Sequence, residues 1–139
     1  MNAREIAHRY YALFNGRRLD EAERLVDPYA VFHYVPTKQR LIGRAGYRAL
    51  AAAWLVAFED ARLEIQSMKR NSNGLLEVEF LGRGTHTGEL VLGEHVIIPP
   101  TERTVELPFR DRLTINDGLI VESQLDFDII ELKKRLLGG

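Results

Sequence analysis

The sequence contains no cysteine, one tryptophan and five prolines among its 139 residues. The lack of cysteine excludes disulfides, a thiolate nucleophile and thiolate metal ligands, and it fits a reducing compartment. No apolar run approaches the roughly 20 residues of a membrane-spanning helix. The first residues, Met1 to Glu5, carry charge where a signal peptide has its apolar core. We therefore expect a cytoplasmic protein with no membrane partner.

An excess of charge of one sign is also missing, because 19 Lys and Arg residues nearly balance 20 Asp and Glu residues. The net charge of −1 gives no reason to expect nucleic acid as a partner. The chain also lacks a glycine-rich phosphate-binding loop, a nucleophile elbow and a metal-ligand spacing such as His-x-x-x-His. We therefore expect no cofactor and no metal site.

The composition that is present is ordinary for a globular protein, with 45% hydrophobic and 28% charged residues. The length suits a single domain over residues 1–139. Helical spacing of apolar residues and alternation typical of strands divide the chain into elements. Helices are expected from the Asn2 cap to Asn15, at 19–26, at 43–58 and at 129–137, and strands at 29–35, 61–70, 75–87, 91–98, 105–115 and 119–127.

Helices come first in this order and an antiparallel meander follows, which is an α+β pattern. Asn116-Asp117-Gly118 predicts a tight hairpin turn between the last two strands, because Gly supplies positive φ at low cost. A curved sheet wrapped around the N-terminal helices would bury the apolar stripes that contain Tyr10 and Trp54. It would also leave a pocket between its concave face and these helices, and Tyr10 and Trp54 are candidates to line that pocket.

Asp111 is the acid most clearly set on an apolar face. Side chains alternate between the two faces of a strand, so Asp111 shares its face with Leu107, Phe109 and Leu113. A carboxylate there costs several kcal/mol unless it is paired, protonated or hydrated. Asp111 is therefore a candidate catalytic residue, and its alternative role is a hydrogen-bonded structural acid.

Asp128 is the second candidate acid, and it stands where the last strand changes to a helix. Asp128 and Glu131 fit a capping box, which predicts that Asp128 caps the helix. The helix dipole and capping amides would lower its pKa, whereas burial against apolar walls would raise it. The sequence therefore leaves two roles for Asp128, a helix cap and a catalytic acid/base residue.

Two histidines and a glutamine complete the candidate site as groups that could orient a substrate. His33 lies in the middle of a strand without a clearly polar face, and His86 shares strand parity with Val78 and Phe80. Gln124 lies on the more polar face of the last strand. Each histidine has an alternative role as a hydrogen-bonded structural residue.

Several motifs occur in an order typical of one family: Tyr10-Tyr11-Ala12-Leu13-Phe14-Asn15, a Val31–Pro36 strand with a histidine, Gly43, Phe58-Glu59-Asp60, Gly84-Thr85-His86-Thr87-Gly88, Pro100-Thr101 and Asp117-Gly118-Leu119-Ile120-Val121-Glu122 followed by Asp128. Over nearly its whole length the chain resembles the SnoaL-like polyketide cyclases of the nuclear transport factor 2-like superfamily. The resemblance implies a cone-shaped α+β barrel, a homodimer and cofactor-free aldol ring closure. It also marks Asp128 as the acid/base residue.

Our first hypothesis is therefore a cofactor-free enzyme that acts on a small hydrophobic carbonyl compound or a polycyclic ligand. Asp128 or Asp111 would act as acid/base, while His33, His86 and Gln124 would orient the substrate. The second hypothesis is a non-catalytic module of the same fold that binds a small ligand or dimerises, because this fold serves many functions.

Overall fold

Most of the expected helices and strands are present in the computed structural model, which describes residues 1–138. Asn2 and Glu5 form the expected capping box, and Asp128 caps the last helix. Asp117 and Gly118 both take positive φ in the expected hairpin turn. The elements are α1 (Ala3–Asn15), α2 (Leu19–Glu23), β1 (Val26–Tyr34), a 3-10 turn (Val35–Thr37), β2 (Gln39–Ile42), α3 (Gly43–Ala57), β3 (Arg62–Arg70), β4 (Leu76–Thr85), β5 (Leu90–Leu92), β6 (Val96–Ile98), β7 (Thr104–Asn116), β8 (Leu119–Phe127) and α4 (Ile129–Leu137).

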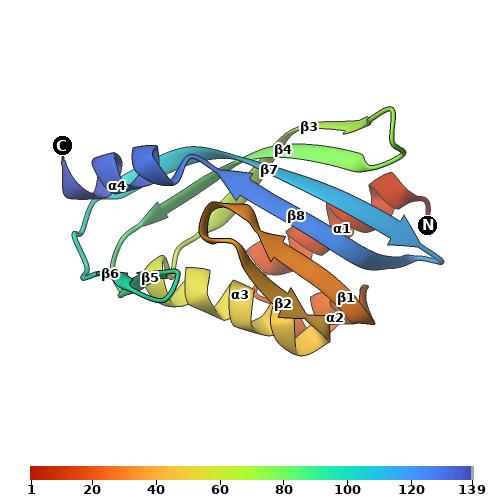
Figure 1. Cartoon of the computed structure of the whole chain (residues 1–139), viewed down its shortest axis with the longest axis horizontal. Helices are drawn as coiled ribbons and strands as arrows, with labels where there is room; N and C mark the ends of the chain where they lie inside the picture. Colours follow the sequence, from red (N-terminus) through yellow and green to blue (C-terminus); the bar gives the residue numbers. More distant parts are fainter. Residues whose placement is uncertain (139) are drawn as a thin grey trace.

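Six strands form one curved sheet in the order β2-β1-β8-β7-β4-β3, and β5 and β6 form a separate hairpin (Figure 1). The sheet is antiparallel except where β1 runs parallel to β8. The expected antiparallel meander therefore misses one pairing, because β1 and β8 are far apart in the sequence and are joined by a long connection. The expectation also missed β2, a four-residue edge strand without a fully buried side chain.

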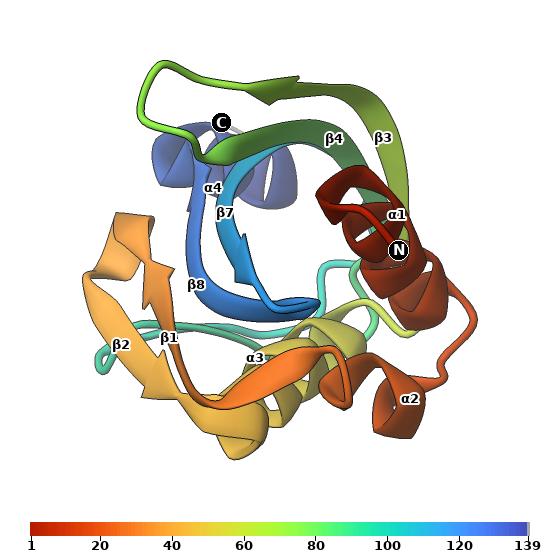
Figure 2. The same cartoon turned by 90° about the vertical axis from the view of Figure 1, so that its right-hand side faces the viewer.

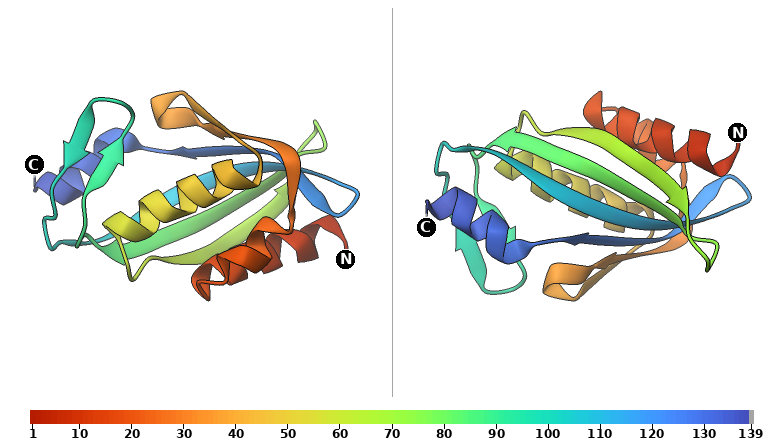
Figure 3. Two further views of the ribbon diagram at one scale, coloured as in Figure 1. Left: turned by 90° about the horizontal axis from the view of Figure 1, so that it is seen from below. Right: turned by 90° about the horizontal axis from the view of Figure 1, so that it is seen from above.

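The sheet curls around α1 and α3, so that the molecule is a cone-shaped α+β barrel, as expected (Figure 2). One cluster of buried side chains joins α1 and α3 to the sheet and includes Tyr10, Phe32 and Leu113. A second cluster lies below α4 and the β5–β6 hairpin and includes Phe58 and Leu132. Figure 3 shows α4 and this hairpin at the same end of the barrel, away from the N-terminus. Within residues 1–138, no helix is both long enough and apolar enough to cross a membrane.

The His86 side chain binds the segment between β6 and β7 through Thr101. The His86 side chain is 0% exposed and its ring packs on Phe58 with 5.3 Å between ring centroids. The His86 Nδ1 atom accepts a hydrogen bond from the backbone N–H of Thr101 at 3.2 Å and lies 3.0 Å from the Thr101 hydroxyl. Because Nδ1 accepts a hydrogen bond from an amide N–H, it carries no proton, and the ring is neutral in this arrangement.

The first residue of α3, Gly43, lies close to the backbone of β1 at Pro28. Gly43 has a φ of +68°, and a Cβ atom there would lie 2.5 Å from the Pro28 carbonyl oxygen. Gly74 has a similar φ of +79° in an exposed turn, but a Cβ atom there would meet nothing within 4 Å. The two positions therefore separate the cost of the left-handed backbone from the cost of a steric clash.

We predict that Gly43→Ala lowers the free energy of unfolding by about 2 kcal/mol more than Gly74→Ala does, because only the methyl group added at position 43 must displace the β1 backbone. Urea denaturation of the two variants and the wild type measures this difference. Equal losses in the two variants would show that the contact with Pro28 imposes no constraint.

We also predict that His86 makes stability depend on pH. Burial lowers the pKa of His86, while the unfolded chain takes up this proton near the ordinary value of about 6.5. The unfolded state therefore binds more protons below that pH, and the free energy of unfolding should decrease as the pH falls from 7.5 to 5.5. Denaturation at both pH values should show a smaller decrease for His86→Gln, and an identical decrease would contradict the prediction.

Candidate functional site

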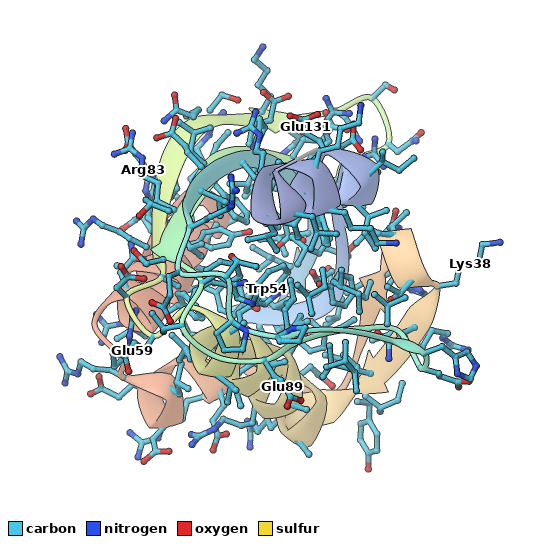
Figure 4. All side chains as sticks on the ribbon, turned by 90° about the vertical axis from the view of Figure 1, so that its left-hand side faces the viewer. Lys38, Trp54, Glu59, Arg83, Glu89 and Glu131 are labelled. Atoms are coloured by element: carbon cyan, nitrogen blue, oxygen red, sulfur yellow. The ribbon has the colours of Figure 1, made fainter. Side chains whose placement is uncertain are left out.

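A cavity of about 100 Å³ that is partly open to solvent lies between the concave face of the sheet and helices α1 and α3. Aromatic side chains make up much of its wall, including Tyr10, Tyr11, Tyr47, Trp54, Phe80 and Phe109. Figure 4 looks at the end of the barrel that carries α4, where Trp54 lies centrally between α4 and α3 while Lys38, Glu59 and Arg83 lie at the periphery.

Asp111 is the only carboxylate among the described lining residues, and its side chain is nearly out of contact with solvent. It is 4% exposed because β7 turns Asp111 toward the concave face together with Leu107 and Leu113, as the alternation in the sequence predicted. Its Oδ2 atom accepts a hydrogen bond of 2.7 Å from the Tyr11 hydroxyl. Its Oδ1 atom accepts one of 2.6 Å from the Ser123 hydroxyl.

The pKa of Asp111 is raised from its ordinary value because burial disfavours the carboxylate, although the hydrogen bonds from Ser123 and Tyr11 oppose that rise. The pKa values of Tyr10 and Tyr11 are also raised, first by burial and further by the neighbouring phenols and the Asp111 charge. The two phenols are therefore neutral hydrogen-bond donors near pH 7, beside a carboxyl group that is a stronger base than an exposed aspartate.

Tyr47 adds a third phenol to this end of the cavity, with its ring centroid 5.3 Å from that of Tyr10. Its hydroxyl oxygen is buried and has no hydrogen-bond partner within residues 1–138. Burial raises the pKa of Tyr47 as well, so that this hydroxyl is also neutral. A buried polar atom without a partner costs free energy unless a water or ligand atom supplies the missing hydrogen bond.

The arrangement offers the parts needed for proton transfer at a carbon next to a carbonyl group. A carboxylate with a raised pKa can remove the proton, and neutral phenols can donate hydrogen bonds to the oxygen on which negative charge develops. The apolar aromatic wall strengthens both interactions because it excludes water. Within residues 1–138, no group of three or more His, Cys, Asp or Glu side chains could hold a metal ion.

The structure brings together only three of the seven candidate residues at the cavity, namely Tyr10, Trp54 and Asp111. His33 and Gln124 are register partners on β1 and β8, whose buried neighbours Tyr34 and Leu125 occupy the other face. His33 lies 3.4 Å from Glu122 on this outer face. The expectation that both residues converge on the pocket with Asp111 is therefore wrong, because strand alternation directs them away from it.

Asp128 and His86 also lie outside the cavity lining. Asp128 is exposed, and its carboxylate accepts a hydrogen bond of 3.0 Å from the backbone N–H of Glu131, as expected of a helix cap. It borders a second groove, of about 480 Å³, on the outer face of the sheet together with Asp126 and Arg110. His86 is buried below the Phe58 ring, where it serves the packing described above.

Sequence reasoning missed the two partners of Asp111. Tyr11 lies beside the Ile6–Tyr10–Phe14 stripe, and the buried face of α1 is wide enough to include it. Ser123 is the single hydroxyl residue on the buried face of β8, between Ile120 and Leu125. A small polar residue among apolar neighbours was the available signal for Ser123, whereas Tyr11 could only be found by its distance to Asp111.

Solved structures of similar fold cover nearly the whole chain. A proposed SnoaL-like polyketide cyclase from Jannaschia sp. CCS1 has a TM-score of 0.83 and 16% identity, over 97% of this chain and 91% of that one. IdmH, a proposed polyketide cyclase from Streptomyces antibioticus, has a TM-score of 0.81 and 23% identity over 100% of both chains. At these identities the likeness shows the shared fold.

A third structure, a hypothetical protein with a ketosteroid isomerase-like fold from Catenulispora acidiphila in complex with trimethylamine, has a TM-score of 0.73 and 14% identity, over 96% of this chain and 90% of that one. No curated protein matches the sequence. A family model described as the SnoaL-like domain matches residues 7–123, which is most of the chain. The chain therefore belongs to the SnoaL-like domain family, within the nuclear transport factor 2-like superfamily.

Proposed function

We propose that the chain is a cofactor-free enzyme that moves a proton at the carbon next to a carbonyl group of a hydrophobic substrate. The observation that carries the proposal is Asp111, a buried carboxyl group with a raised pKa in the wall of an aromatic cavity. Polyketide cyclisation by an aldol reaction begins with this proton transfer, so the proposal agrees with the family.

In the proposed reaction the Asp111 carboxylate removes the proton, the electron pair of the C–H bond forms a carbon–carbon double bond, and the π pair of the C=O bond moves onto oxygen, which gives an enolate. The Tyr10 hydroxyl stabilises the enolate oxygen by donating a hydrogen bond. Asp111 then returns its proton to the enolate carbon, and the carbonyl group forms again. Tyr11 and Ser123 hold the carboxylate in place and act as positioning residues.

Asp111 replaces Asp128 as the acid/base residue in this proposal, although the family resemblance favoured Asp128. An acid/base group must lie within hydrogen-bond distance of the reacting carbon or of one intervening water molecule. Asp111 lines the cavity, while Asp128 caps α4 from the solvent side. The resemblance thus favours Asp128 as the acid/base residue and the geometry favours Asp111. The variants Asp111→Asn and Asp128→Asn distinguish the two.

A second candidate function is a non-catalytic module that binds a small hydrophobic ligand. One observation favours it, because Tyr11 and Ser123 already donate hydrogen bonds to both oxygens of Asp111. In that case Asp111 would order the cavity wall without exchanging a proton. Proton exchange in a bound ketone separates the two functions.

We predict that the protein catalyses deuterium uptake into the carbon next to the carbonyl group of cyclohex-3-enone in D₂O, measured by NMR. Asp111→Asn should lower the rate by about 100-fold or more, because acid/base groups contribute 10² to 10⁴. Asp128→Asn should keep both the rate and the stability, since Asn caps a helix as well as Asp does. The wild-type rate should rise with pH as Asp111 ionises, with a midpoint above the ordinary value of about 3.9.

Stability measurements make these rates interpretable. The folded state disfavours the Asp111 carboxylate, so its raised pKa contributes stability that is present at low pH and lost as the pH rises through the folded pKa. Asp111→Asn should therefore be at least as stable as the wild type at pH 7 in urea denaturation. Full exchange activity in a folded Asp111→Asn variant, or loss of activity only in Asp128→Asn, would contradict the proposed role of Asp111.

We also propose that the chain forms a homodimer, as the family resemblance suggests. One chain has a mass of 15.9 kDa, so light scattering should give twice that mass at micromolar concentration. A mass of a single chain under these conditions would argue against the dimer.

A further inference from the structure

We infer that the cavity accepts a single neutral six-membered ring that carries one oxygen atom, such as a monocyclic enone or a phenol, and not a fused polycycle. The inference rests on the proposed function, because it takes the cavity around Asp111 as the substrate site. Among hydrophobic carbonyl compounds, it selects those with a single six-membered ring and no net charge.

The volume of the cavity sets the size limit. At about 100 Å³ the cavity is smaller than an engineered 150 Å³ protein cavity that binds benzene. Pockets for drug-sized ligands occupy roughly 300 to 1,000 Å³. A second fused ring would therefore have to displace the wall of the cavity.

The wall is built from interlocked aromatic rings that resist such displacement. Phe80 and Phe109 stack almost in parallel, with 5.2 Å between centroids and an interplanar angle of 4°. Trp54 meets Phe109 edge to face at 5.6 Å and 85°. Forcing extra atoms into a packed core costs about 1 to 3 kcal/mol, which corresponds to about a tenfold to hundredfold loss of affinity.

The polar atoms of the cavity wall determine the charge of the ligand and the number of oxygen atoms that it can carry. The Tyr11 and Ser123 hydroxyls contact Asp111 directly, and the ring of Tyr10 lies 5.1 Å from that of Tyr11 and 5.3 Å from that of Tyr47. The one arginine among the described lining residues, Arg83, directs its guanidinium to Glu64 and Glu106 at 3.0 and 2.6 Å, with nearly half of its side chain exposed.

An anionic ligand would therefore enter an apolar cavity beside a carboxyl group without a cation to balance its charge. A neutral oxygen, by contrast, can accept a hydrogen bond from a phenol such as Tyr47, whose hydroxyl has no other partner within residues 1–138. One such oxygen at the Asp111 end, with the ring against the aromatic wall, satisfies both requirements.

The experiment compares the affinities of phenol, cyclohex-2-enone, 2-naphthol and benzoate for the folded protein by calorimetry at pH 7. Phenol and cyclohex-2-enone should bind, and both should quench Trp54, which is the single tryptophan of the chain and part of the cavity wall. 2-Naphthol and benzoate should bind at least about tenfold more weakly than phenol. Area burial alone predicts the opposite order for 2-naphthol, which is the larger apolar ring system.

Two leucine variants test whether the cavity itself excludes the second ring. Leu63→Ala removes side-chain atoms from the cavity lining and should bring the affinity for 2-naphthol close to that for phenol. Leu81→Ala is the matched control, because it removes the same atoms from the outer face of the sheet and should leave the ratio unchanged.

Tighter binding of 2-naphthol than of phenol by the wild type, equal binding of benzoate, or no binding of either single-ring compound at millimolar concentration would overturn the inference. Failure of the proposed function is a different result. If phenol is preferred over 2-naphthol but cyclohex-3-enone takes up no deuterium, the ring preference stands and the catalytic role of Asp111 falls. If deuterium uptake occurs but 2-naphthol binds as well as phenol, the catalytic role of Asp111 stands and the ring preference falls.

Discussion

The Asp111 carboxyl group is the point on which the interior of this protein depends. It joins β7 to α1 and to β8. The Tyr11 hydroxyl on α1, 100 residues away in the sequence, donates a hydrogen bond to one of its oxygens, and the Ser123 hydroxyl on β8 donates one to the other. A buried carboxyl group is costly unless its oxygens are satisfied, so helix and sheet must keep this spacing. The same cost raises its pKa, and a raised pKa makes the group useful for proton transfer.

The aromatic side chains around Asp111 give this carboxyl group its surroundings. The Tyr10, Tyr11 and Tyr47 rings form one contact series, and the Phe80–Phe109 stack adjoins it, with the Phe80 ring centroid 5.4 Å from that of Tyr11. These rings exclude water and limit the space, while their hydroxyls supply neutral donors. The proposed chemistry and the inferred selectivity therefore share one physical origin, a small aromatic pocket whose described lining contains a single carboxyl group.

Local patterns in the sequence predicted much of the fold and part of the site. Alternation along β7 placed Asp111 on the buried face, and helical spacing placed Tyr10 and Trp54 in the interior. The same reasoning left His33 without an assigned face, because neither face of its strand is clearly polar, and it placed Gln124 on the more polar face of its strand without deciding whether that face lines the cavity. Their position became clear only when β1 paired with β8 and both residues fell on the outer surface.

The sequence by itself determined the α+β class, the hairpin at Asp117-Gly118 and the cap at Asp128, because each depends on residues only a few positions apart. Only the tertiary structure decided which acid belongs to the cavity. Asp111 and Asp128 are both plausible from local pattern, and the choice between them depends on strand pairing and on the distant residues Tyr11 and Ser123. Burial and long-range hydrogen bonds arise from packing, so a local pattern cannot contain them.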